Sequence, residues 1–173
     1  MKTITRVGAG LAVVLAGGCN FSFFGAEEVE LAIRSDRESY AVERAELGYR
    51  VDLTFTLRNE GDVTVYVANC GDVIVGRLEK RVGSDWVTTL PPAAPLCLSV
   101  PSPIRPGASL STTVQVFAAY AANEVQPKLQ VPGIEGAYRA VFESLVTSPD
   151  DPPRERQSVL PERQRTSNTF RLE

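Results

Sequence analysis

Three cysteines, Cys19, Cys70 and Cys97, are the most reactive side chains of this 173-residue chain, which contains no histidine. Histidine is the usual general base near neutral pH and a frequent ligand of transition metals. Its absence excludes Ser-His-Asp and Cys-His catalysis, and three cysteines alone do not complete the usual four-ligand zinc site. We therefore expect no catalytic residue, no metal and no cofactor, and assign the cysteines to attachment and cross-linking.

Cys19 follows a segment with the layout of a secretory signal. A cationic start, Met1–Arg6, leads into the apolar stretch Val7–Ala16 and then two glycines. The apolar stretch is too short for a permanent membrane-spanning helix. Small residues directly before a cysteine resemble the lipobox of bacterial lipoproteins, which implies that residues 1–18 are removed and that Cys19 carries lipid. The usual lipobox has Leu where this chain has Ala16, and an ordinary signal peptide cleaved at a small residue is the alternative.

Lipidation of Cys19 would leave an acidic exported chain on a membrane anchor. That chain has 16 basic and 21 acidic residues, a net charge of −5, which gives no footprint for nucleic acid. The resemblance to lipoproteins implies the outer membrane, facing the periplasm or the exterior, because Asn20 stands where inner-membrane lipoproteins typically carry Asp. Residues 19–28 would form a tether, whose three phenylalanines lie either at the membrane interface or against the base of the domain.

Cys70 and Cys97 would then be an even pair in an oxidising compartment. They are 27 positions apart, closer than the inter-sheet disulfide of antibody domains. We predict a disulfide that ties the end of a strand to the proline-rich segment containing Cys97, and a loop of this size contributes roughly 3–4 kcal/mol. A redox or metal-binding pair is the alternative, although the chain has no Cys-x-x-Cys spacing to favour it.

The most polar segment is 148–165, with four prolines and charges of both signs. Such a segment is typical of a solvated loop, and a partner-docking loop is the alternative. Asp150 and Asp151 lack the spaced oxygen ligands of a calcium loop. Paired carboxylates for glycosidase chemistry are available among 21 acidic residues, yet no pattern places two of them in a common apolar cleft. We expect no enzyme.

The elements that position these residues are predicted to be strands. The clearest is Leu47–Arg58, where six apolar residues alternate strictly with polar ones. The turn Asn59–Asp62 leads to Val63, Val65 and Val67, predicted as the antiparallel partner of that strand. Further strands are predicted over Val29–Ile33, Ile74–Val82, Trp86–Leu90, Leu110–Val116, Tyr138–Ser144 and Asn168–Leu172.

The connecting segments contain little helical periodicity. Pro91–Pro106 is a proline-rich crossing without a long ladder, Ala118–Asn123 is predicted as a short helical turn, and Pro127–Gly136 as a loop. The fold class that follows is all-β, an antiparallel β-sandwich of about 7–8 strands in one domain, residues 29–173.

Several short motifs follow one another in a characteristic order. They are Tyr40, Leu57-Arg58-Asn59, Cys70, Arg81-Val82-Gly83 with Trp86, Cys97, Pro106-Gly107, Gly136-Ala137-Tyr138-Arg139 and Ser167-Asn168-Thr169-Phe170. The ordered set resembles the bacterial immunoglobulin-like domain of small envelope lipoproteins. The resemblance implies an immunoglobulin-like sandwich and very little about activity. The stretches 118–133 and 148–165 depart from the family pattern.

Two of these motif residues are expected to have structural roles. Tyr138, two residues after Gly136 at a strand start, fits a tyrosine corner, in which the hydroxyl bonds back to nearby backbone. Trp86 follows a tight turn, and we expect it to pack in the core or cover the hairpin. A sugar-binding platform is the alternative for Trp86.

Two classes of function remain open. The first is a non-catalytic, lipid-anchored envelope module that binds or spaces another envelope component, with no nucleic acid and no small-molecule substrate. The second is an inhibitor or accessory subunit of an exported protease or other envelope enzyme, acting through the loop 148–165 or 91–106.

Overall fold

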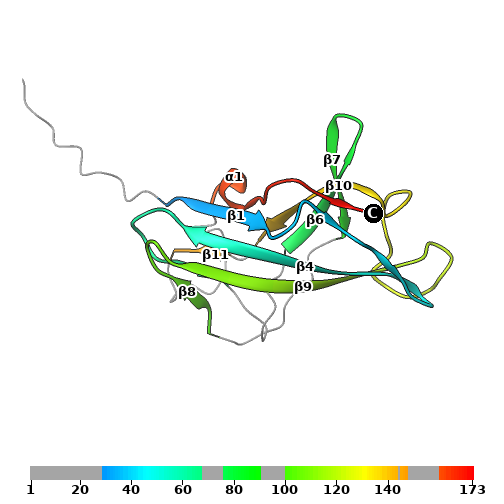
Figure 1. Ribbon diagram of the computed structural model, residues 1–173, viewed down its shortest axis with the longest axis horizontal. Helices are drawn as coiled ribbons and strands as arrows, with labels where there is room; N and C mark the ends of the chain where they lie inside the picture. The colour runs from blue at the N-terminus through cyan, green and yellow to red at the C-terminus, as the bar shows by residue number, and fades with distance from the viewer. Residues whose placement is uncertain (1–28, 68–75, 91–99, 144, 148–159) are drawn as a thin grey trace, which may run out of the picture.

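The computed structural model describes residues 29–67, 76–90, 100–143, 145–147 and 160–173. Cys19, Asn20, Cys70, Cys97 and residues 148–159 lie outside these ranges, so the lipid anchor and the disulfide stay predictions. The described residues form an elongated all-β sandwich with one short helix (Figure 1). That helix has four residues, and the described part of the chain contains no helix that is long and apolar enough to cross a membrane.

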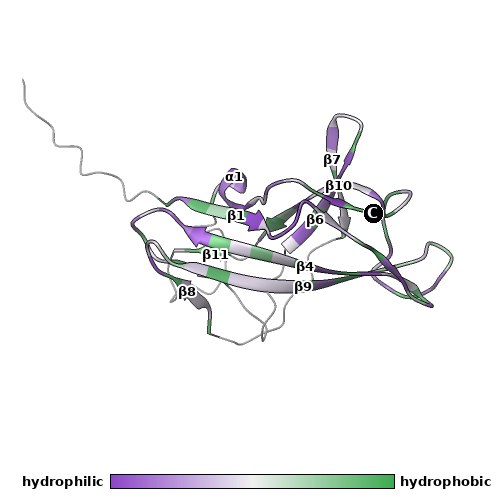
Figure 2. Ribbon diagram, in the orientation of Figure 1, coloured by the Kyte–Doolittle hydropathy of each residue, from purple (hydrophilic) through white to green (hydrophobic). Residues whose placement is uncertain are grey.

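The first layer is built around one long strand. β4 pairs along its whole length with β9, and two short strands share its other side. Hydrophobic and polar residues alternate along β4 as the sequence predicts (Figure 2), and the inward-facing Val51, Leu53, Phe55 and Leu57 are all buried. The strands of this layer are β1 (Leu31–Ser35), β3 (Glu43–Arg44), β4 (Gly48–Asn59) and β9 (Ser109–Ala119).

The second layer has the strand order β2-β12-β10-β6-β7. Its pairs are antiparallel except β2 with β12, which run parallel at the edge of the sheet. The β6–β7 hairpin is confirmed, and its turn contains Gly83 at φ 62°, in the left-handed region that favours glycine. The strands are β2 (Ser39–Tyr40), β6 (Gly76–Val82), β7 (Asp85–Leu90), β10 (Gly136–Phe142) and β12 (Phe170–Leu172).

A third, small sheet continues the second layer toward the end where β1 begins. β5 (Val65–Val67) lies between β11 (Leu145–Val146) and β8 (Ser102–Ile104). β10 and β11 are nearly consecutive in the chain, and they pair with β6 and β5 respectively. The described residues contain twelve strands where the sequence predicts seven or eight, and the excess includes two-residue strands such as β2 and β3.

Aromatic rings join the two layers. Phe55 of β4 meets Phe142 of β10 and Phe170 of β12 edge to face, with ring centroids 5.5 and 5.7 Å apart. The rings of Tyr40 and Tyr138 also lie against Phe170, with centroids 5.6 and 6.3 Å from its own. All five side chains are at most 5% exposed, so the core lies where these strands cross.

The predicted pairing of Val63–Val67 with β4 is wrong. β5 belongs to the third sheet, and Asn59 redirects the chain between the layers. The Asn59 side chain is fully buried, and its amide donates to Val63 O at 2.7 Å and to Ile104 O at 2.8 Å. The residues after Asn59 therefore lead from the first layer to the third sheet. The buried Asn59 amide fixes this connection because it bonds both to Val63 O, four residues on, and to Ile104 O of β8.

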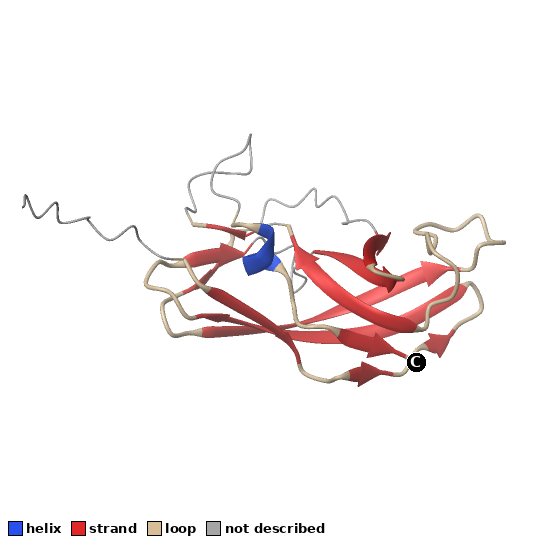
Figure 3. Ribbon diagram, turned by 90° about the horizontal axis from the view of Figure 1, so that it is seen from above, coloured by secondary structure: helices blue, strands red, loops and turns tan. Residues whose placement is uncertain are grey.

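Two further predictions are corrected. Ala118–Asn123 is not a helical turn, because Ala118 and Ala119 end β9 and the chain then turns, with Asn123 N donating to Tyr120 O. The last six residues of the insert 148–165 are not a solvated loop. Leu160 is 5% exposed, and Glu162–Arg165 form helix α1, which lies against the strands (Figure 3).

Candidate functional site

Tyr138 lies where the chain enters β10, and its ring is almost fully buried. Its hydroxyl donates to Ile134 O, four residues upstream, at 2.6 Å, which is the geometry of a tyrosine corner. Burial raises the pKa of Tyr138 well above that of a free tyrosine. The side chain therefore stays protonated and fixes the loop that precedes β10.

Trp86 is half-buried on the outer side of β7, away from the core. The guanidinium of Arg139 lies 4.7 Å from the centre of its ring, and that of Arg81, its cross-strand partner, lies 5.8 Å away. Both separations are within the range of cation–π contacts. The guanidinium of Arg139 covers one face of the ring, which favours a cover over the hairpin.

Arg139 belongs to a cluster of charges that sequence reasoning missed. Glu79 of β6 is 5% exposed and accepts from Arg77 Nε at 2.8 Å and from Arg139 Nε at 2.7 Å. A buried carboxylate is stable only when its oxygens are paired in this way. Arg77 and Glu79 are two residues apart on β6 and so project from the same face of the sheet. Arg139 of β10 lies directly opposite Glu79.

The cluster extends from the sheet to the C-terminal part of the insert. Arg77 also pairs with Glu143 and, at 3.0 Å, with Glu162 of α1, and Arg165 pairs with Glu143 at 2.7 Å. Arg165 further donates to Leu160 O at 2.7 Å. We call the six side chains the Arg–Glu network: Arg77, Glu79, Arg139, Glu143, Glu162 and Arg165.

The electrostatics of the Arg–Glu network oppose acid–base chemistry. Burial would raise the pKa of the Glu79 carboxyl, but hydrogen bonds from Arg77 and Arg139 outweigh burial and hold that pKa below its usual value. Burial opposes the charge on Arg77, yet bonds to Glu79 and Glu162 raise the pKa of Arg77. Burial and the nearby charge of Arg77 lower the pKa of Arg165. Glu79 is thus ionised at neutral pH and is a poor general acid.

A second cluster lies at the end of the sandwich where β4 begins. The Tyr120 hydroxyl donates to Ala45 O at 2.9 Å, and the Asn123 amide donates to Leu47 O at 2.8 Å. These bonds join the loop after β9 to the loop before β4. The rings of Tyr49 and Tyr120 meet edge to face at 4.9 Å. Leu47 is 47% exposed and Val125 36% exposed. We call Leu47, Tyr49, Tyr120, Asn123 and Val125 the distal loop cluster.

A shallow cleft of about 180 Å³ is lined by residues of β2, β3 and β4. Tyr40 lines it, with its hydroxyl 2.5 Å from Asp36 Oδ1, and burial together with this bond raises the pKa of Tyr40 to about 12. The charged lining residues are two basic and two acidic side chains: Arg37, Arg50, Glu43 and Asp52. Within the described ranges no three Cys, Asp or Glu side chains gather as a metal site would require.

A scan against models of known protein families finds no match, and a search of curated proteins finds none either. Among solved structures the chain matches a β-glucosidase from Listeria innocua, at 14% identity and a TM-score of 0.32. The match covers 84% of this chain and 16% of that one, so the chain spans about one sixth of its length. A likeness this weak has no bearing on function.

Proposed function

We propose that the protein is a non-catalytic, lipid-anchored module of the bacterial envelope that presents one end of an immunoglobulin-like sandwich to another envelope protein. The observation that carries this proposal is the separation between the two ends. At one end, the first residue of β1 pairs with Asn59, the last residue of β4. At the other end, Leu47 of the distal loop cluster comes directly before the first residue of β4. Twelve strand residues place the two ends about 35 Å apart.

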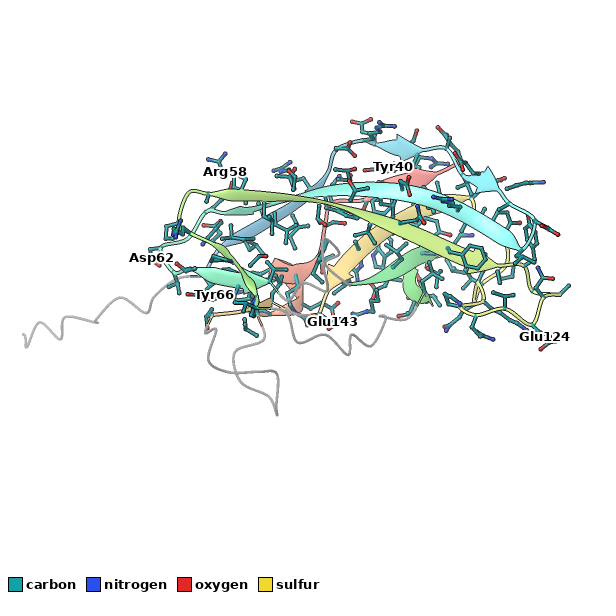
Figure 4. The ribbon with its side chains drawn as sticks, turned by 90° about the horizontal axis from the view of Figure 1, so that it is seen from below. Tyr40, Arg58, Asp62, Tyr66, Glu124 and Glu143 are labelled. Carbon is teal, nitrogen blue, oxygen red and sulfur yellow. The ribbon has the colours of Figure 1, made fainter. Side chains whose placement is uncertain are left out.

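The anchor and the sandwich would lie close together. Ten positions separate Cys19 from Val29, so the tether spans at most about 35 Å when fully extended. A domain on so short a tether stays near the membrane surface, and the end that bears Arg58 and Asp62 is the nearer one. Glu124, next to Val125, lies at the opposite end (Figure 4). The distal loop cluster would therefore face away from the membrane.

The chemistry of the distal loop cluster suits binding. Its loops are held by hydrogen bonds from Tyr120 and Asn123, so little conformational entropy remains to be lost when a partner binds. Leu47 and Val125 expose aliphatic surface, and the same cluster contains two tyrosines, a residue type that is enriched at protein interfaces. By contrast the ionisable groups of the Arg–Glu network pair with one another, which supports a scaffold role.

The lipid anchor is tested by replacing Cys19. The Cys19→Ala chain should be found in the soluble fraction, or retained as an uncleaved precursor, while wild-type chain stays with the membrane and partitions into detergent. A Cys19→Ala chain that is processed normally and remains membrane-bound would contradict the anchor. Intact mass of the extracted wild-type chain adds the second readout, the mass of the attached acyl groups.

The binding end is tested by a photo-reactive residue introduced at Leu47 or, as control, at Arg58. Both positions are exposed, and they lie at opposite ends of β4. Irradiation of whole cells should give one discrete covalent adduct with an envelope protein from position 47 and none from position 58. Adducts from both positions or from 58 alone would contradict the orientation. Inhibition of an exported protease by the purified chain would favour the inhibitor instead.

A further inference from the structure

β9 is an unusual edge strand. Seven strands pair on one side only within the described residues, and six of them are either short or carry a charge or proline that discourages further pairing. β2 and β11 have two residues each, and the others contain Arg34, Glu43, Arg44, Asp85 or Pro103. β9 has eleven residues, Ser109–Ala119, without a charge or a proline. It is the longest of the seven and lacks these protective features.

The outward-facing side of β9 is also uncharged. Ser111 and Thr113 exchange hydrogen bonds with Thr56 and Thr54 across the β4 pairing, at 3.1 and 3.0 Å, and Gln115 donates to Asp52 at 3.0 Å. These bonds add side-chain links to the backbone pairing of β9 with β4. At its last residue β9 is capped, because Ala119 bridges to Lys128. Within the described residues, no strand pairs with the other side of the stretch from Thr113 to Ala118.

We propose that this stretch of β9 pairs antiparallel with the same stretch of a second copy of the chain, about a two-fold axis at Gln115. Antiparallel pairing about that axis sets Gln115 opposite itself and Thr113 opposite Phe117 of the other copy. The first layers of both copies then join into one continuous sheet through β4-β9-β9-β4. The pairing does not depend on the lipid anchor, and it uses neither the distal loop cluster nor the Arg–Glu network.

The absence of charge near Gln115 suits self-pairing. The two-fold axis sets residue 115 opposite its own copy, so a charge at that position would face a like charge. A strand that pairs with a charged partner would be expected to carry residues of the opposite charge, and β9 carries none. Pairing over about five residues buries little area, so the dimer should be weak in dilute solution and stronger where copies are concentrated on one surface.

Cysteine cross-linking in cell membranes tests the pairing and its register. Across the proposed axis the Cα atoms of two copies of residue 115 lie about 5.5 Å apart, within the range of Cα separations that disulfides span. Gln115→Cys should therefore give a covalent dimer on mild oxidation that reverts on reduction. The matched control is Asp52→Cys, the cross-strand neighbour of Gln115 on β4, which lies about 14 Å from its counterpart. No dimer from Gln115→Cys, or equal dimer from both variants and from wild type, would overturn the proposal.

Charge variants separate loss of pairing from loss of folding. In sedimentation of the full detergent-extracted chain, Gln115→Lys should weaken dimerisation about fivefold or more, because two ammonium groups face each other. Mixing Gln115→Lys with Gln115→Glu should restore the dimer as a mixed pair. Dimer unaffected by Gln115→Lys, or no recovery on mixing, would overturn the proposal. So would slow exchange of the amides of Thr113, Gln115 and Phe117, which point away from β4, in the isolated monomer, since a segment of the same chain would then cover the edge.

Discussion

Buried polar side chains hold the connections of this sandwich at the scale of single residues. Asn59 bonds to carbonyls on both sides of a crossing, Tyr138 to the loop before β10, and Tyr40 to Asp36 and Thr54. A buried hydrogen bond adds only about 1 kcal/mol, but an orphaned buried carbonyl costs more. Removal of one such side chain should therefore affect stability more than its size suggests.

Tyr138→Phe should lower the free energy of unfolding by about 1–3 kcal/mol, because Ile134 O loses its donor in a buried site. Tyr120→Phe is the matched control. It removes the same hydroxyl from a bond to Ala45 O, but that bond is exposed and water replaces it. The control should change stability by less than about 0.5 kcal/mol. Urea denaturation of both variants measures the difference, and equal losses would contradict the buried corner.

Ionisation of Tyr40 should make the free energy of unfolding depend on pH in the alkaline range. Its pKa is raised from 10.0 to about 12 in the folded chain, so the unfolded chain releases the proton first. The contribution is complete below pH 10 and is lost as pH rises toward 12, by about 2–3 kcal/mol in total. Urea denaturation at a series of pH values from 9 to about 11.5 should show this decline in wild type.

Tyr40→Phe is the variant that isolates this effect. It should be less stable than wild type at pH 9, because Asp36 and Thr54 O lose a donor, yet its stability should fall less steeply above pH 10. Parallel curves for the two proteins would show that another group, such as Tyr138, causes the alkaline decline.

At the scale of secondary-structure elements, the Arg–Glu network joins β6, β10 and α1. Glu79→Gln leaves Arg77 and Arg139 without their shared carboxylate, so the free energy of unfolding should fall by about 1–3 kcal/mol. The loss is smaller than for a fully buried pair because the arginine side chains are 19% and 24% exposed. Chemical denaturation at pH 7 gives the value.

Acid provides an independent check on the same carboxylate. The pKa of Glu79 is lowered from 4.5 in the folded chain, so its contribution is present above that pH and fades as pH falls further. The difference in free energy of unfolding between wild type and Glu79→Gln should therefore shrink as the pH falls below 4.5. Glu60→Gln is the control, because the Arg58–Glu60 pair is exposed and worth less than about 0.5 kcal/mol. Equal effects at positions 60 and 79 would contradict the network.

The end of the insert is predicted to be structural. Leu160 is 5% exposed next to α1, so Leu160→Ala should lower the free energy of unfolding by about 2–3 kcal/mol. Val100→Ala is the control, since Val100 is 81% exposed and should change stability by less than about 0.5 kcal/mol. Thermal unfolding of the two variants decides the matter. A Leu160→Ala chain as stable as wild type would restore the solvated-loop interpretation.

Sequence periodicity predicted the elements better than their partners. β4 and the β6–β7 hairpin follow from alternation and turn chemistry, which act over a few residues. The partner of β5 does not follow, because Asn59 turns the chain toward a carbonyl 45 residues away. For the same reason the spacing of Arg77 and Glu79 indicates a shared face, while their contacts with Glu162 depend on tertiary packing.

At the scale of the whole molecule, the register of the third sheet bears on the predicted disulfide. Val67 at the end of β5 is the cross-strand partner of Ser102 at the start of β8. Cys70 follows Val67 by three residues, and Cys97 precedes Ser102 by five. The segments that contain the two cysteines therefore adjoin the same pair of residues, Val67 and Ser102, and three and five residues are by length alone sufficient for a disulfide between them.

The extracted protein should accordingly contain one disulfide between Cys70 and Cys97. Intact mass should rise by two hydrogens on reduction, and alkylation without reduction should label neither residue. Reduction should lower the free energy of unfolding by about 3–4 kcal/mol, because the unfolded chain regains the entropy of the closed loop. The double variant Cys70→Ser and Cys97→Ser should match reduced wild type and be insensitive to reductant. Free thiols at both positions in oxidised wild type would mean that the β5–β8 rung holds the crossing without a covalent link.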